Sequence, residues 1–168
     1  MMALRPVVSK ILLTQCRTRK CCFRTIVGRA MEEADVHPSQ GSMDLVVVGA
    51  HMTGLPLNHQ LTDLHASFVK ACKTAPVYRM YSLGPRPALI RQHEKDAGVA
   101  FAVEVWSMPL NKVGAFLLNG VKPPLCIGDV LLEDGTEVKG FLGEAYAVQG
   151  AEDVSAYGGW RAYVSSRS

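Results

Sequence analysis

The chain has 168 residues, of which 48% are hydrophobic and 20% are charged, and its formal net charge is +3. This length fits one domain with an appendage, and no apolar run approaches the ~18 residues of a membrane-spanning helix. Residues 1–30 hold seven Lys or Arg and no acid, so the remaining 11 basic and 15 acidic residues leave the rest mildly acidic. This distribution argues against nucleic acid as a partner of the folded part, and no membrane partner is expected.

The basic N-terminal segment predicts either a targeting signal or an extension without function. Its Arg, Lys, Ser and Thr are interleaved with Leu, Ile and Val, which is typical of an organelle transit peptide. Residues 32–42 form a polar linker, and Met31 and Met43 are both possible starts. We therefore expect an extension over 1–42, a folded domain over 43–168, and a mitochondrial or other organellar location, with a cytoplasmic one as the alternative.

The predicted elements begin with a buried strand over 44–49, which contains a β-branched run. A helix is predicted over 57–70, because Leu57, Leu61, Leu64 and Phe68 recur at spacings of three and four. Residues 77–82 alternate like a strand, and a Gly-Pro-Arg-Pro turn follows at 84–87. Residues 88–91 and 99–106 read as two further strands, which a polar turn would join as a hairpin.

The second half predicts a short helix over 109–118, which two successive prolines prevent from continuing. Strands over 127–132 and 136–142 flank an Asp134-Gly135 turn, a strong hairpin signal. Residues 144–148 are a short run of mostly apolar residues, and residues 150–155 are predicted to form a loop. Together these elements predict an α+β fold: a small mixed β-barrel with a flanking helix.

Four segments carry a family resemblance: VVVGAHMTGLPLNHQL, KTAPVYRMYSL, IGDVLLEDGTEVKGFLGEAYAV and GAEDVSAYGGWRAYV. In this order they resemble the C-terminal domain of allophanate hydrolase, from about residue 43 to residue 164. The resemblance implies a γ-glutamylcyclotransferase-like fold. The amidase half is not expected here, because 42 residues cannot hold it.

The resemblance also implies a function in urea and allophanate nitrogen metabolism. The expected step is decarboxylation of N-carboxycarbamate, a small dianion that a separate amidase releases. A non-catalytic module that binds a small acid, an amidase or a second copy is the alternative. A γ-glutamylcyclotransferase is less expected, because residues 107–125 contain no Asp or Glu for the acid that the family keeps there.

The loop after the first strand holds the catalytic candidate, His51. A polar residue at the exit of an apolar strand is not expected to fill the core, and the resemblance implies a histidine here. Imidazole titrates near neutral pH, which suits delivery of a proton to nitrogen as CO₂ leaves. The alternative is a solvated or capped loop histidine. As a polar loop residue, His51 is expected to contribute little to stability.

Neighbouring residues would complete an anion pocket. Gly49 and Gly54 either leave peptide N–H groups free for an anion or only shape the turn. Asn58 either contacts substrate or caps the helix. Arg79, if it faces the interior, is one carboxylate clamp.

Arg161 is the second clamp, unless it forms a structural ion pair with Glu144 or Asp153. Glu104, the only charge in its apolar strand, faces either water or the interior. The expected substrate-binding set is Gly49, Thr53, Gly54, Asn58, Arg79, Tyr81, Glu144, Tyr157 and Arg161. Neither a metal-ligand spacing nor a phosphate loop is present in the sequence, so no metal or cofactor is expected.

Overall fold

The computed structural model describes residues 41–93 and 96–167. Residues 1–40 of the predicted N-terminal extension lie outside these residues. The strands are β1 (Ser42–Val47), β2 (Ser67–Lys73), β3 (Tyr78–Ser82), β4 (Pro87–Arg91), β5 (Ala102–Pro109), β6 (Leu125–Leu131), β7 (Glu137–Gly143) and β8 (Glu152–Asp153). The α-helices are α1 (His59–Thr62), α2 (Leu110–Gly120) and α3 (Trp160–Ser165), and 3₁₀ turns cover Ala145–Val148 and Ser155–Tyr157.

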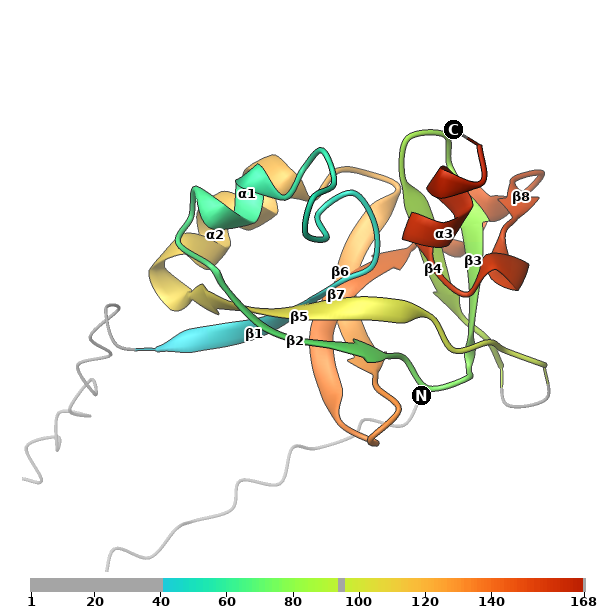
Figure 1. The fold of residues 1–168 in the computed structure, drawn as a ribbon, viewed down its shortest axis with the longest axis horizontal. Coiled ribbons are helices and arrows are strands. Elements are labelled where there is room, and N and C mark those ends of the chain that lie inside the picture. Colours follow the sequence, from blue (N-terminus) through green and yellow to red (C-terminus); the bar gives the residue numbers. More distant parts are fainter. Residues whose placement is uncertain (1–40, 94–95, 168) are drawn as a thin grey trace, which may run out of the picture. The chain divides into compact units, whose positions relative to one another are not determined.

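The strands form two sheets (Figure 1). The larger has the order β2-β5-β1-β7-β6 and the smaller the order β4-β3-β8. β1 lies at the centre of the larger sheet, antiparallel to β5 and parallel to β7. Its residues Leu45, Val46 and Val47 are fully buried, which confirms the predicted buried strand.

The larger sheet curls until its two edges meet at one end. Beyond β2, Thr74 forms an isolated bridge with Leu132, which follows β6. The Ala75 N–H donates to the Leu131 carbonyl at 2.9 Å, and the Glu133 N–H donates to the Lys73 carbonyl at 3.0 Å. The sheet therefore has the curvature of a partly closed barrel.

The predicted helix over 57–70 is wrong in its second half. The helix covers only His59–Thr62, and 67–73 is strand β2, paired with β5. His65 adopts a left-handed backbone conformation (φ 61°), which ends the helical turn. Phe68, which completed the helical spacing, lies edge-on to Trp106 of β5, with ring centroids 5.7 Å apart.

The hairpin predicted between 88–91 and 99–106 is also wrong. β4 pairs with β3, whereas β5 pairs with β1 and β2. The β6–β7 hairpin and α2 are confirmed, and Gly135 takes a positive φ of 84° in the hairpin turn. The predicted loop over 150–155 contains β8, and the run over 144–148 is largely a 3₁₀ turn.

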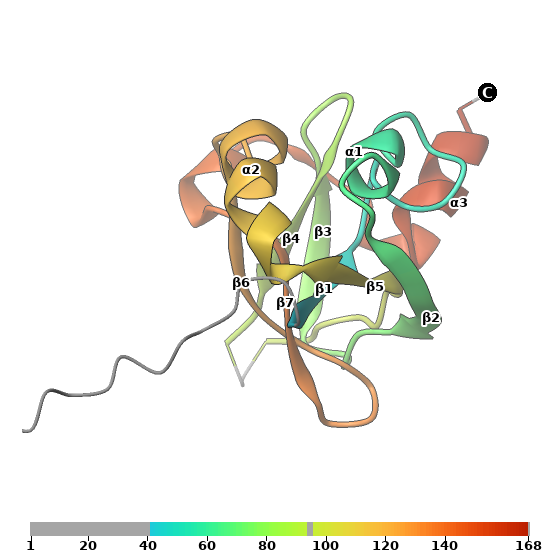
Figure 2. The same cartoon turned by 90° about the vertical axis from the view of Figure 1, so that its left-hand side faces the viewer.

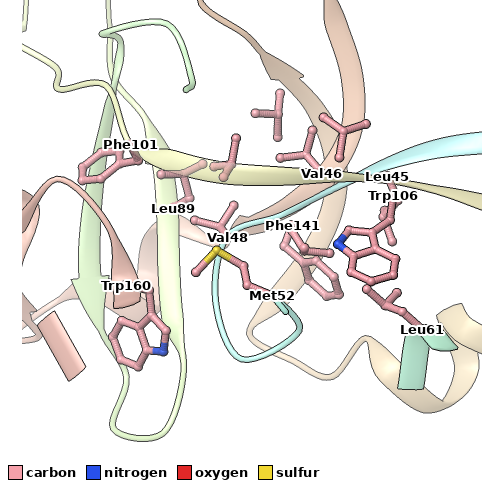
Figure 3. Packing of buried hydrophobic residues seen from close by; sticks show 14 of the residues in the cluster. Leu45, Val46, Val48, Met52, Leu61, Leu89, Phe101, Trp106, Phe141 and Trp160 are labelled. Carbon is pink, nitrogen blue, oxygen red and sulfur yellow. The ribbon is translucent and has the colours of Figure 1, made fainter. Parts of the chain in front are cut away.

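Two helices cover one face of the larger sheet, where α1 and α2 lie side by side (Figures 1 and 2). Leu61 of α1 and Phe116 of α2 are buried there, with exposed fractions of 0% and 1%. Leu61, Val46, Trp106 and Phe141 belong to one continuous core (Figure 3). In the described part of the chain, no helix is both long and apolar enough to span a membrane.

Candidate functional site

The loop that follows β1 folds back tightly on itself. The Met52 N–H donates to the Gly49 carbonyl, and the Leu57 N–H donates to the Ala50 carbonyl, each at 2.9 Å. A Cβ on Gly49 would lie 2.5 Å from Cδ of Pro87, so only glycine allows this approach of the loop to β4. Gly54 adopts a φ of 72°, which glycine favours.

His51 is buried, contrary to the expectation that it is a loop side chain outside the core. Its side chain is packed so that the residue is only 7% exposed. The imidazole stacks on Phe141, with centroids 4.9 Å apart and 15° between the planes, and Phe116 meets it edge-on at 5.6 Å. The loop thus inserts the ring between the larger sheet and α2.

Two amide side chains hold His51 in place. Nε2 of the ring lies 3.0 Å from Oε1 of Gln60. Nδ2 of Asn58 donates to the His51 carbonyl at 2.9 Å, and the Asn58 side chain makes no capping hydrogen bond to α1. The sequence left open whether Asn58 caps the helix or contacts substrate. In the structure, its side chain fixes the backbone of His51.

The electrostatic environment favours a neutral ring. Burial lowers the pKa of His51 from its usual 6.5, and the hydrogen bond to Gln60 opposes this shift only in part. With the Gln60 oxygen accepting, Nε2 carries the hydrogen of the neutral ring and Nδ1 has the lone pair. Nδ1 is then the atom that can take up and release a proton.

A cavity of about 50 Å³ borders His51. Its other walls include Gly49, Pro87, Gly120 and Arg86, and Arg86 is the one charged residue among the described residues that line it. Nη2 of Arg86 donates to the Pro123 carbonyl at 3.1 Å. Within the described residues, the N–H groups of Ala50 and His51 donate to no backbone carbonyl, so they are candidates for an anion.

A second polar cluster surrounds Glu104 of β5, which is 8% exposed and faces the interior. Its Oε2 accepts hydrogen bonds from the Thr53 N–H (2.8 Å), the Thr53 hydroxyl (2.9 Å) and Nε1 of Trp106 (3.1 Å). Nη2 of Arg161 lies 3.3 Å from Oε1 of Glu104 and donates to the Thr53 carbonyl at 2.8 Å.

This cluster anchors the loop on its other side. Thr53 follows His51 by two residues and is tied to β5 and α3 at once. Arg161 pairs with Glu104, and not with Glu144 or Asp153, the two partners considered from the sequence. A cleft of about 510 Å³ is lined by Glu104, Arg161 and Tyr157, among others.

The remaining predicted residues lie away from the His51 cavity. Tyr78 and Met80 are the buried pair of β3, so Arg79 and Tyr81 occupy the opposite face. Nη1 of Arg79 pairs with Asp153 at 2.8 Å, with its side chain 41% exposed. Glu144 is exposed, and its N–H donates to the Pro124 carbonyl.

Tyr157 is partly exposed and packs edge-on against Tyr163, with centroids 5.2 Å apart. Neither it nor Arg161 lines the cavity beside His51. In contrast, Arg86 lines it, although the sequence indicated only a turn at that position. The sequence also did not indicate Gln60 as a site residue, because a short helical turn does not reveal which side chain Gln60 faces. The described residues contain no cluster of three or more His, Cys, Asp or Glu that could hold a metal ion.

Comparisons with known proteins confirm the family resemblance. The family model of the allophanate hydrolase C-terminal domain matches residues 43–165. Urea amidolyase from Saccharomyces cerevisiae is 40% identical over 136 residues, which cover 77% of this chain and 7% of that protein. The chain therefore spans a small part of this curated relative.

Solved structures show the same relationship. Kluyveromyces lactis allophanate hydrolase is 36% identical with a TM-score of 0.71, covering 76% of this chain and 22% of that one. A uropathogenic Escherichia coli-specific protein is 33% identical with a TM-score of 0.70, covering 74% of this chain and 97% of that one. The mixed α+β fold agrees with the prediction. This chain belongs to the allophanate hydrolase C-terminal domain family.

Proposed function

We propose that the chain acts on a small carboxylated urea derivative, and that its reaction is the decarboxylation of N-carboxycarbamate released by a separate amidase. The main support is a buried imidazole, His51, that borders a small cavity together with one cation, Arg86. Family membership supports the same substrate chemistry, because the relatives include an allophanate hydrolase and a urea amidolyase.

In this proposal His51 supplies the proton. When the C–N bond to the departing carboxylate breaks, its electron pair stays on nitrogen and CO₂ leaves. The imidazolium of His51 protonates that nitrogen, which yields carbamate and a neutral ring that solvent then reprotonates. Burial lowers the pKa of His51, so the imidazolium is a stronger acid than usual, and an anionic substrate beside it would favour its formation.

Arg86 and the loop amides would bind the carboxylates. A guanidinium forms charge-assisted, bidentate hydrogen bonds with a carboxylate, and oriented N–H groups stabilise negative charge without reorganisation. Arg79 and Arg161 are less suited to this role than the sequence suggested, because Asp153 and Glu104 already pair with them. This function requires that the chain binds a small anion and works with a partner amidase.

The proposal is tested by CO₂ release from allophanate. An amidase-only enzyme is supplied with allophanate, and the rate of CO₂ formation is followed with and without this chain. The wild-type chain should accelerate release, and His51→Asn should lose roughly two to four orders of magnitude of that effect. His93→Asn, a histidine exposed to solvent, is the matched control and should behave as wild type.

Two outcomes would contradict this function. No acceleration by the wild-type chain would favour the non-catalytic module that binds a small acid or an amidase. Full activity of His51→Asn would place the chemistry elsewhere in the molecule. Release of 5-oxoproline from a γ-glutamyl dipeptide would instead indicate a cyclotransferase, although the described residues that line the His51 cavity include no carboxylate.

A further inference from the structure

A second and much larger cavity adjoins the one beside His51. It measures about 1040 Å³ and is bordered by the loop after β1, the β3–β4 turn and α3. Ala50, Leu57 and Arg86 line both cavities. The two spaces therefore share a wall, and Arg86 is the charged residue in that wall.

The small cavity cannot hold the whole of the proposed substrate. Its 50 Å³ is about four times the ~10–15 Å³ that a cavity needs to hold one water. This is room for about one carboxylate, whereas N-carboxycarbamate carries two carboxylates on a nitrogen. The rest of any substrate with its carboxylate beside His51 must therefore extend toward the larger cavity.

The larger cavity has the walls of a site for an apolar group. Leu55, Leu83 and Trp160 contribute to its lining. Its volume of about 1040 Å³ slightly exceeds the ~300–1,000 Å³ usual for small-molecule sites. A bare second carboxylate would use little of this surface.

The polar residues of this cavity are largely paired with one another. The Tyr163 hydroxyl donates to Oε2 of Glu152 at 2.9 Å and accepts from Nη1 of Arg167 at 2.7 Å. Nη1 of Arg167 also lies 3.3 Å from Glu152. This arrangement leaves Arg86 as the better anchor for a carboxylate, and the apolar side chains as the distinctive surface of the larger cavity.

We propose that the larger cavity binds an apolar substituent of the substrate, so that the chain acts on N-carboxycarbamates that carry this substituent on the nitrogen. This inference rests on the proposed function and extends its substrate class beyond N-carboxycarbamate. The carboxylate to be lost lies beside His51, Arg86 contacts it at the junction of the two cavities, and the substituent on nitrogen packs against Leu83 and Trp160.

Two stable dicarboxylates test the inference by calorimetric titration of the full chain. Malonate replaces the central nitrogen of N-carboxycarbamate by carbon, and benzylmalonate adds an apolar group there. Burial of the ring should make benzylmalonate bind about ten- to a hundredfold more tightly than malonate. Leu83→Trp, which fills part of the larger cavity, should abolish this preference.

A matched variant and circular dichroism separate these effects from misfolding. Leu118→Trp adds the same side chain on α2, where Leu118 is 76% exposed, and should retain the preference. Equal or weaker binding of benzylmalonate would overturn the inference while leaving the proposed function intact. A preference that persists in folded Leu83→Trp would also overturn it. Failure of both ligands to bind, together with no CO₂ release in the amidase assay, would overturn both proposals.

Discussion

Nε2 of His51 lies 3.0 Å from Oε1 of Gln60, nine residues further along the chain. This contact joins the loop after β1 to α1 and sets which ring nitrogen carries the hydrogen. It also gives the imidazole a neutral partner, so burial is the largest influence on its pKa.

Replacing Gln60 by a carboxylate should favour the charged form of the His51 ring over the neutral form. Gln60→Glu would place a negative charge beside Nε2, which favours the imidazolium and raises the pKa of His51 above its wild-type value. An NMR pH titration of the ring measures this directly. Thr62→Glu adds the same charge at an exposed position of α1 and should shift the titration much less; an equal shift in both variants would show that the effect is not local.

The stability of the protein should depend on His51 below about pH 6.5. Because burial lowers the pKa of the folded ring from 6.5, the unfolded chain binds a proton more readily between the two pKa values. The resulting contribution is fully present above pH 6.5 and decreases as the pH falls toward the folded pKa. Urea unfolding at pH 7.5 and pH 5.5 should show this loss, and the loss should be smaller in His51→Gln.

The variant itself should be less stable at both pH values. Its side chain cannot reproduce the stacking on Phe141, and we expect a cost of roughly 0.5–3 kcal/mol in the free energy of unfolding. Identical pH dependence in the two proteins would mean that other groups account for the loss.

Glu104→Gln should destabilise the fold through the polar cluster that it anchors. The carboxylate accepts hydrogen bonds from Thr53 and Trp106 and pairs with Arg161. A neutral amide cannot satisfy all of these donors, so we expect a loss of about 1–3 kcal/mol in urea unfolding. Glu137→Gln, which breaks an exposed pair with Arg91, is the control and should cost less than about 1 kcal/mol.

A chain that begins at Gly41 should fold on its own. β1 starts at Ser42, and the Leu110 N–H donates to the Gly41 carbonyl at 3.0 Å, so a cut further on would remove native contacts. Its thermal unfolding midpoint should match that of the full chain within a few degrees. A midpoint far below this would show that the preceding residues contribute to the domain. The organellar address of residues 1–42 stays a separate prediction, for which a fluorescent reporter fused to them is the measurement.

Local signals predicted the elements that depend on local chemistry. The β-branched run of β1, the alternation in β3 and the turn at Gly135 each correspond to what the structure contains. The helix over 57–70 failed because Phe68 matched the helical spacing by coincidence while its partner, Trp106, lies on a distant strand. The choice of strand partners for β4 and β5 likewise depends on contacts that no local pattern encodes.

The candidate site was likewise predicted only in part. The family resemblance indicated His51 and its loop, but not that Phe116 and Phe141 enclose the ring. Arg86 enters the site through the packing of Pro87 against Gly49, a tertiary contact. Arg79 was predicted as a site residue from its charge alone. Its ion pair with Asp153 depends on the pairing of β8 with β3, which the sequence does not reveal.

The central position of β1 has a consequence for the order in which the protein can form. A ribosome makes this apolar strand before any of its sheet neighbours, and Leu45 and Val46 meet Lys139 and Gly140 of β7, close to a hundred positions later. Until β5 and β7 have emerged, the growing chain has no place to bury it. We therefore expect a nascent polypeptide that stays open, and that relies on chaperones, until synthesis is almost finished.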